Sequence, residues 1–437
     1  MARAMKDSGI EWIGEIPEGW KVSKVSTFFD IQLGKMLQPS QENESDTYES
    51  YLCAANLGNN KLKMEPLKQM WFSREDKEKF SVRCGDLLVV EGGDVASSDI
   101  IAEPVHGLYI QNALHRVRSR NGFELRFLRY YLSIAKASGH IDLICNKATI
   151  AHFTKDKFGA LPYVVVPLEE QKRIADYLDS ECARIDAVIE QTRASIEEYK
   201  KLKQSVITQA VTKGIRPGRK MKDSGVEWIG EIPEEWTVRP LKSYIDILPG
   251  YAFSSDDFNV DQGIRLLRGI NVAPGSIRWD DVVYWNKEIT DQIKQFELKE
   301  GDLVVGLDRP WISDGTRAAF LHEGDMPCLL LQRVCRIRPN KDTDIRFVYH
   351  TIVGKSFEDA LGTDTTGVSV PHISTKQIQQ YLVAFPCKEE QMEISDYIDE
   401  KSANIDALIQ KKQQLLDELE SYKKSLIFEY VTGKKVI

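Results

Sequence analysis

The chain has 437 residues, of which 42% are hydrophobic and 28% are charged, and it carries a net charge of −8. This length predicts several compact domains, and this composition excludes a wholly disordered, collagen-like or membrane-embedded protein. Seven scattered cysteines without a CxxC pair, and the lack of any long apolar run, predict a protein of the reducing cytoplasm without structural zinc.

The opening segment of the chain occurs twice. The 18 residues from Met5 recur from Met221 with 15 identities, at an offset of 216. A second match joins the segments that begin at Glu169 and Glu389. The chain is therefore predicted to contain two unequal copies of one plan, each with an opening segment, a variable middle and a long closing segment.

Tryptophans flank an Ile-Pro turn in both copies of the opening segment. They are Trp12 and Trp20 in the first copy, and Trp228 and Trp236 in the second. Because they belong to the duplicated part of the chain, they cannot distinguish the two halves, and we assign them to structure.

The variable middles contain short apolar runs separated by Gly, Asn and Asp turns, which is typical of small α/β domains. Strands are expected near 87–90, 163–166, 303–305 and 329–331, and helices near 125–137 and 345–357.

The closing segments carry heptad repeats, which predict long amphipathic helices. The first stripe contains Leu178, Ile185, Thr192, Tyr199 and Val206, flanked by Val188, Ile189, Ile196 and Leu202. The second contains Ile398, Ile405, Lys412, Leu419 and Leu426, flanked by Leu408, Ile409, Leu415, Leu416 and Tyr422. Each helix should start after a proline, Pro167 or Pro386, and end at a glycine, Gly214 or Gly433. Since each stripe needs a partner, the two helices are expected to pair as an antiparallel coiled coil within the chain.

The fold class predicted from these elements is α+β, with two α/β domains alternating with two long helices and an internal pseudo-two-fold repeat. The expected segments are the opening repeat (1–22), the first α/β domain (23–166), the central helical spacer (167–215), the linker with the second opening repeat (216–238), the second α/β domain (239–385) and the C-terminal helical spacer (386–437).

Basic residues gather locally on this acidic chain. Residues 106–157 hold nine Lys and Arg against three Asp and Glu, and residues 200–222 hold eight bases and no acid. Such patches could contact nucleic-acid phosphates, although charge alone favours a charge-balanced, solvated surface.

Motifs for catalysis are missing from the sequence. We find no GxSxG, HExxH, P-loop or GxGxxG pattern, and no Asn/Asp-Pro-Pro-aromatic tetrapeptide of amino-group methyltransferases. The chain is therefore predicted not to be an enzyme by itself.

Three features resemble the specificity subunit of type I restriction-modification systems: the duplicated opening segment, the GDLLVV run from Gly85 with GDLVV from Gly301, and the PLEEQKRIADYLD run from Pro167 with EEQMEISDYID from Glu389. The resemblance covers nearly the whole chain. It implies a cytoplasmic DNA-recognition subunit that docks two modification subunits, which methylate adenine N6 with S-adenosylmethionine, and restriction subunits, which use ATP and Mg²⁺. This chain is then expected to bind no cofactor itself, and the outward faces of the acidic helices are candidate docking sites for the modification subunits.

Two similar domains on a helical spacer predict a reader with two heads. Because the middles differ, the DNA target should be asymmetric and bipartite, with an unread gap. A paired helix of about 40 residues spans about 60 Å, and major-groove faces recur about every 34 to 36 Å. Inserting whole turns into the helices should therefore change the gap.

Base reading requires Arg, Lys, Asn, Gln or small polar side chains on loops. In the first middle the candidates are Lys35, Asn56, Lys61, Lys63, Lys147, Thr149 and His152, while Arg116, Arg118 and Arg120 would contact the DNA backbone or water. In the second middle the candidates are Tyr251, Phe253, Ser254, Arg265, Arg268, Asn271, Thr365, Thr366, Ser369 and His372. For each single residue, a role in the scaffold or at the solvated surface stays open.

Two other functional hypotheses stay open at this point. The chain could be a nuclease or methyltransferase with an unrecognised site, which purified protein acting alone on DNA would reveal. It could also be an interaction scaffold or DNA-binding regulator without restriction partners, which the neighbouring genes would reveal.

Overall fold

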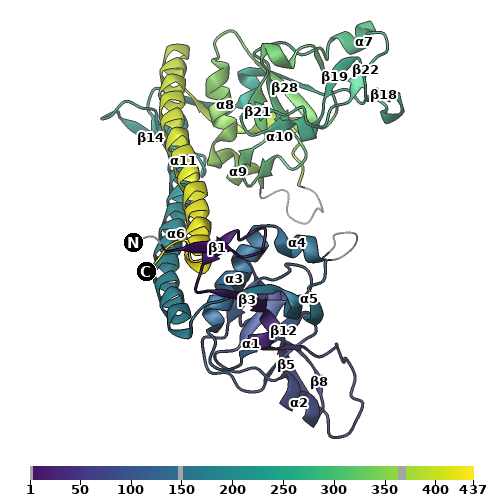
Figure 1. Ribbon diagram of the computed structural model, residues 1–437. Coiled ribbons are helices and arrows are strands. Elements are labelled where there is room, and N and C mark those ends of the chain that lie inside the picture. The colour runs from purple at the N-terminus through teal and green to yellow at the C-terminus, as the bar shows by residue number, and fades with distance from the viewer. Residues whose placement is uncertain (1–2, 146–150, 363–370) are drawn as a thin grey trace. The chain divides into compact units, whose positions relative to one another are not determined.

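The computed structural model describes residues 3–145, 151–362 and 371–437 (Figure 1). The chain forms two compact units. Unit 1 comprises Met1–Arg193 and Gln414–Ile437, and unit 2 comprises Ala194–Gln413. Each unit thus contains one opening segment, one variable middle and part of each long helix. Within the described ranges, no helix combines the length and apolar character needed to cross a membrane.

The first copy of the plan contains the elements up to the central helix. They are β1 (Met5–Asp7), β2 (Glu15–Pro17), β3 (Lys21–Lys24), α1 (Val25–Phe28), β4 (Phe29–Leu33), β5 (Thr47–Leu52), η1 (Ala54–Asn56), β6 (Leu57–Gly58), β7 (Lys61–Leu62), β8 (Lys68–Phe72), α2 (Arg74–Phe80), β9 (Leu87–Val90), β10 (Ser98–Ile100), β11 (Leu108–Ile110), β12 (Leu114–Ser119), α3 (Leu125–Ala137), α4 (His140–Cys145), α5 (Lys155–Ala160), β13 (Pro162–Val165) and α6 (Leu168–Lys213).

The second copy follows the same order with a longer set of short elements. They are β14 (Met221–Asp223), β15 (Glu231–Pro233), β16 (Thr237–Pro240), η2 (Leu241–Ser243), β17 (Ile245–Pro249), η3 (Ser255–Asp257), β18 (Phe258–Asn259), β19 (Ile264–Leu267), η4 (Gly269–Asn271), β20 (Val272–Ala273), β21 (Ser276–Ile277), β22 (Tyr284–Trp285), α7 (Asp291–Lys294), β23 (Leu303–Gly306), β24 (Trp311–Ile312), β25 (Gly315–Thr316), β26 (Ala318–Phe320), η5 (Glu323–Asp325), β27 (Cys328–Leu330), β28 (Val334–Pro339), α8 (Ile345–Val353), α9 (Lys355–Gly362), α10 (Thr375–Gln380), β29 (Leu382–Phe385) and α11 (Lys388–Val431).

The two variable middles share one sheet framework. In unit 1 an antiparallel sheet has the order β10-β9-β12-β4, and beside it β11 pairs in parallel with β5. In unit 2 the corresponding order is β26-β23-β28-β17, and β27 pairs in parallel with β19. The register also agrees, because Leu114 faces Val90 as Val334 faces Gly306. Positions in one unit can therefore be matched to positions in the other.

The strands and helices expected from the apolar runs are present. The helix at 125–137 is confirmed as α3, and the four strands are confirmed to within one residue at each end as β9, β13, β23 and β27. The helical patch at 345–357 is divided into α8 and α9 at Gly354, where the backbone is extended with ψ 147°. A side chain there would press on the carbonyl of His350 and on Ile207 of α6.

Both long helices begin and end where the sequence predicts. α6 follows Pro167 and stops before Gly214, and α11 stops shortly before Gly433. These two glycines have φ of 72° and 75°, a left-handed conformation that glycine adopts without strain and that ends a helix.

The helices run antiparallel in each unit, which confirms the expected pairing. In unit 1, Lys423 pairs with Asp186 at 2.6 Å, and the Tyr430 ring contacts the Tyr177 ring at a tilt, with the ring centroids 4.6 Å apart. In unit 2, Lys203 pairs with Asp406 at 2.6 Å. Partner numbers rise on one helix as they fall on the other, as an antiparallel pair requires.

The predicted apolar stripes are wider than the stripes that the helices bury. Leu178 and Ile185 are buried as expected. By contrast, some of the flanking side chains that we assigned to the same faces are 39–50% exposed, namely Val188, Leu202, Leu408, Leu415 and Tyr422. This part of the prediction is wrong because a helix pair covers only a narrow seam, and the adjacent heptad positions face away from it.

Each opening segment contacts the start of a long helix, α6 in unit 1 and α11 in unit 2. In unit 1, Trp20 is buried and its indole donates a hydrogen bond of 3.2 Å to Glu170 at the start of α6. In unit 2, Trp236 donates the same bond to Glu390 at the start of α11. The structural assignment of the duplicated tryptophans is confirmed for this pair.

A helix of each α/β domain is tied to a long helix by a charged contact. In unit 1, Arg126 of α3 pairs with Asp176 and Asp179 of α6. In unit 2, Arg346 of α8 pairs with Asp396 and Asp399 of α11. The repeated contact fixes each domain on its own part of the spacer.

The contact in unit 2 should make stability depend on pH. Nε2 of His350 lies 2.9 Å from the Asp399 carboxylate, and this close contact with His350, followed by the charge of Arg346, lowers the pKa of Asp399 below the ordinary 3.8. A lowered carboxyl pKa stabilises the fold above the ordinary value, and this stabilisation is lost as the pH falls through the lowered value. Asp399→Asn should therefore flatten the acid side of the stability curve.

Urea unfolding between pH 6 and pH 2 would measure this effect. The matched control is Asp280→Asn, which changes an exposed carboxylate away from the contact and should keep the wild-type slope. Equal acid slopes for wild type and Asp399→Asn would contradict the prediction.

Candidate nucleic-acid interface

The turn after the edge strand β4 or β17 is the same in both units. Lys35 forms an isolated parallel β-bridge with Gln111, and Tyr251 forms one with Leu331. The preceding residue must be glycine, because a Cβ at Gly250 would lie 2.1 Å from the Leu331 carbonyl oxygen. Lys35 and Tyr251 therefore occupy one framework position with different chemistry.

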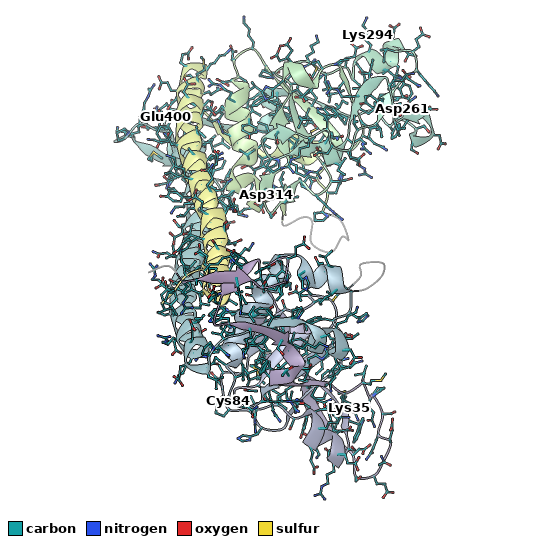
Figure 2. The ribbon with its side chains drawn as sticks, viewed as in Figure 1. Lys35, Cys84, Asp261, Lys294, Asp314 and Glu400 are labelled. Carbon is teal, nitrogen blue, oxygen red and sulfur yellow. The ribbon has the colours of Figure 1, made fainter. Side chains whose placement is uncertain are left out.

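Neither side chain at this position is free in the structure. Lys35 forms an ion pair with Asp76 of α2, its ammonium lies over the Phe72 ring, and its side chain is 12% exposed. Figure 2 labels Lys35 on unit 1. Tyr251 packs against the rings of Phe253 and Phe296. Either side chain would have to leave these partners within the protein before it could contact a base.

The two predicted asparagines are buried parts of the framework. Asn56 accepts a hydrogen bond from the Cys53 amide and donates to the carbonyls of Lys63 and Pro66. Asn271 makes the equivalent bonds with Arg268, Arg278 and Asp281. Since both amides are already satisfied, the structure gives them a loop-holding role and no free edge for a base.

The predicted arginines of β12 also belong mainly to the framework. Arg116 is buried, donates to the carbonyls of Lys79 and Ser81, and has its pKa lowered by burial. Arg118 pairs with Asp86 at 2.7 Å, which raises the pKa of the guanidinium. The second copy repeats this last pair as Arg338 with Asp302. Only Arg120 is exposed.

The predicted residues of the second middle likewise divide into side chains held within the protein and side chains exposed at the surface. Phe253 is 4% exposed, and Arg265 donates to the carbonyls of Gly324 and Met326 while lying over the Trp279 ring. Arg268 pairs with Asp281 at 2.7 Å. Ser254 is exposed.

Lys61 and Lys63 are exposed on unit 1. They flank Leu62 in and after β7, in the loop that Asn56 holds. Neither ammonium has a partner among the described residues, so this loop offers two free positive charges.

We define a histidine corner in each unit. It is the place where the segment before α5 or α10 meets the residues that follow the central strand β9 or β23. The histidine corner of unit 1 consists of Glu91–Gly93, Ala113 and His152. His152 bridges Gly92, and its Nδ1 lies 3.0 Å from the Glu91 carboxylate. Below it, Nε2 of buried His115 lies 2.7 Å from the Phe153 carbonyl, and burial lowers the pKa of His115.

The histidine corner of unit 2 consists of Leu307–Arg309, Arg333 and His372. His372 bridges Asp308, and its Nδ1 lies 2.8 Å from the Asp308 carboxylate. Arg333 lies 3.6 Å from the same carboxylate. The structure thus places both predicted histidines at one position of the framework, each exposed and each beside an acid.

Five predicted residues lie outside the described residues, directly before these histidines in the sequence. They are Lys147, Thr149, Thr365, Thr366 and Ser369. As DNA contacts they stay predictions, as do the others above.

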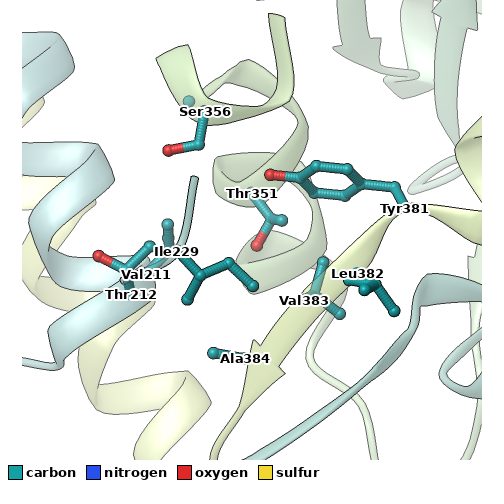
Figure 3. Close-up of a pocket in the computed structure, with 10 residues that line it drawn as sticks. Val211, Thr212, Ile229, Thr351, Ser356, Tyr381, Leu382, Val383 and Ala384 are labelled. Carbon is teal, nitrogen blue, oxygen red and sulfur yellow. The ribbon is translucent and has the colours of Figure 1, made fainter. Parts of the chain in front are cut away.

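The cavity in Figure 3 is too small for a substrate. It holds about 10 Å³ between α6, α8, α9 and β29, with Val211, Thr351 and Tyr381 among its lining residues. This is room for about one water molecule. A larger cleft of about 280 Å³ lies in unit 1 and includes Lys24, Arg120 and Lys155.

Sequence reasoning missed Glu91, Asp308, Arg309 and Arg333. Acidic partners of the histidines were invisible because they lie 61 and 64 residues away in the sequence. A signal for Arg309 did exist, because Arg309 lies eight residues after Gly301 of the GDLVV run, and Gly93 lies eight residues after Gly85 of the GDLLVV run.

Comparison with known proteins agrees with this architecture. The family model described as type I restriction modification DNA specificity domain matches residues 17–198 and 233–420. The chain is 27% identical over 420 residues to the type I restriction enzyme MjaVIII specificity subunit of Methanocaldococcus jannaschii, covering 96% of this chain and 93% of that one. It is 37% identical over 171 residues to the EcoAI specificity subunit of Escherichia coli, covering 39% of this chain and 29% of that one.

Solved structures show the same fold. A chain from a study of complex assembly and conformational transition in the type I R-M system aligns with a TM-score of 0.73 at 15% identity, covering 95% of this chain and 98% of that one. The HsdS subunit from Thermoanaerobacter tengcongensis aligns with a TM-score of 0.53 at 16% identity, covering 96% and 98%. With two matched domains, two long helices and similarity along nearly its whole length, this chain belongs to the family of type I restriction-modification DNA specificity subunits.

Proposed function

We propose that this chain reads an asymmetric DNA site in two parts, one per unit, and performs no chemistry itself. The carrying observation is that the two units share one framework while the exposed positions on it differ. Gly93 against Arg309 and Ala113 against Arg333 are examples of equal positions with different side chains, and both arginines are exposed. Equal frameworks would place both readers similarly on a duplex, and different surfaces would select different bases.

The proposal also covers the complex that this chain would form with modification and restriction subunits. Two modification subunits would supply S-adenosylmethionine-dependent adenine N6 methylation, and restriction subunits would supply the ATP- and Mg²⁺-dependent steps. The exposed apolar side chains Val188, Leu408 and Tyr422, set among the charges of the long helices, support these helices as the docking sites. A compartment that holds DNA and these partners, the cytoplasm, follows from the proposal.

Mapping N6-methyladenine across the host genome tests this function. With the gene intact and its partners expressed, we expect one gapped, asymmetric motif to be methylated on both strands, and deletion of the gene should abolish that methylation. Exchanging the middle of unit 2 should change one half-site and leave the other. An unchanged methylome after deletion would reject the proposal and favour a scaffold or regulator.

A further inference from the structure

Two arginines of unit 2 hold a backbone conformation that arginine rarely adopts. Arg309 has φ of 44° and Arg333 has φ of 70°. The left-handed region is disfavoured for residues with a Cβ, and asparagine and glycine are its usual occupants. Both arginines belong to the histidine corner of unit 2: Arg309 follows Asp308 in the sequence, and Arg333 lies 3.6 Å from the Asp308 carboxylate.

Unit 1 shows what the same positions hold without arginine. The bridge from Gly92 to His152 matches the bridge from Asp308 to His372. The next residue is therefore Gly93 in unit 1, with φ of 95°, and Arg309 in unit 2. Likewise the residue before Leu114 is Ala113, and the residue before Val334 is Arg333. At the first position, unit 2 thus keeps a strained arginine where unit 1 has a glycine that adopts a positive φ without strain. At the second position the two backbones differ, because Ala113 is not left-handed and Arg333 is.

The backbone around both arginines is held firmly. The Arg309 amide donates to the Pro371 carbonyl at 2.7 Å, and the Arg333 carbonyl accepts from the Leu307 amide at 2.9 Å. Arg317 donates to the carbonyls of Val272 and Asp308, the residue before Arg309. Surroundings that impose a strained conformation are characteristic of functional sites.

Their guanidinium groups are available, unlike those of the framework arginines. Arg333 is 59% exposed and reaches Asp308 only at 3.6 Å, while His372 occupies that carboxylate at 2.8 Å. Arg309 is exposed and has no ion pair among the described residues. Figure 2 labels Asp314, which lies in the β24–β25 turn that follows Arg309 in the sequence.

We propose that Arg309 and Arg333 determine specificity in unit 2 by reading guanine in its half-site. The guanidinium fork matches the O6 and N7 acceptors of guanine in the major groove, which lysine cannot reproduce with the same geometry. Unit 1, with Gly93 and Ala113, makes no such contact from these positions. This inference rests on the function proposed above and names the residues that carry one half of it.

The test uses the complete complex with its modification subunits and compares wild type with Arg309→Gly, Arg309→Lys and Arg333→Ala. N6-methyladenine mapping gives the motif, and methylation of duplexes with each base substituted gives the discrimination. We expect preference for guanine in the unit 2 half-site to fall about tenfold or more with each variant, while the unit 1 half-site stays unchanged. The control Arg239→Ala removes an exposed arginine from β16 and should leave both half-sites unchanged.

The test includes one stability control and separates two contrary outcomes. Arg309→Gly should melt at the wild-type temperature or above it, because glycine relieves the left-handed strain, so loss of folding cannot explain a loss of reading. Weaker methylation of all sequences alike, with Arg309→Lys restoring it, would mean that the arginines hold phosphate, and would overturn the inference. A wild-type complex that methylates no bipartite motif would instead overturn the proposed function.

Discussion

Gly250→Ala is expected to lower the free energy of unfolding by about 3 kcal/mol or more. The added Cβ would lie 2.1 Å from the carbonyl oxygen and 2.3 Å from the carbonyl carbon of Leu331. These are backbone atoms of a buried strand end, so the contact can be relieved only by separating β17 from the turn before β28. Chemical denaturation of the purified chain measures the loss.

Gly324→Ala is the matched control in the same unit. Nothing lies within 4 Å of a Cβ at this position, and its backbone is not left-handed. Its stability should stay within about 1 kcal/mol of wild type, with a small gain from a less flexible unfolded chain. If both variants unfolded at the same denaturant concentration, the close approach at Gly250 would not affect stability, and the prediction would be wrong.

Asn56→Ala is expected to cost about 3 kcal/mol of stability. The side chain makes three hydrogen bonds with backbone groups at a site that is 4% exposed. Each such bond contributes about 1 kcal/mol, and the abandoned groups are left without partners in the interior. Asn271→Ala should cost a similar amount, because the second copy repeats all three bonds.

This result separates the loop-holding role from base reading. Lys61→Ala removes an exposed ammonium from the loop that Asn56 holds, so it should leave stability unchanged and weaken DNA binding by the assembled complex, with a smaller dependence on salt. If Asn56→Ala instead left stability unchanged and relaxed only the DNA motif, the asparagine would be a base reader as the sequence suggested.

The predicted site residues show where reasoning from sequence stops. Asn56 and Arg118 were chosen because their side chains suit base edges or phosphates, yet both are occupied within the protein by partners that lie 3 to 37 residues away in the sequence. The duplication contains a usable signal here, because Arg118 of the first copy recurs as Arg338 in the second. Residues that read different half-sites should differ between the copies, so this recurrence indicates a structural role.

The sequence by itself determined the two-copy plan, the long antiparallel helices, their ends at Gly214 and Gly433, and the family. These features rest on repetition, heptad spacing and glycine conformation, which are local properties of the chain. Only the tertiary structure decided which polar side chains are free. Exposure depends on partners brought together by folding, as His372 meets Asp308 and Lys35 meets Asp76. The strained backbone of Arg309 is likewise imposed by distant hydrogen bonds, which no local pattern records.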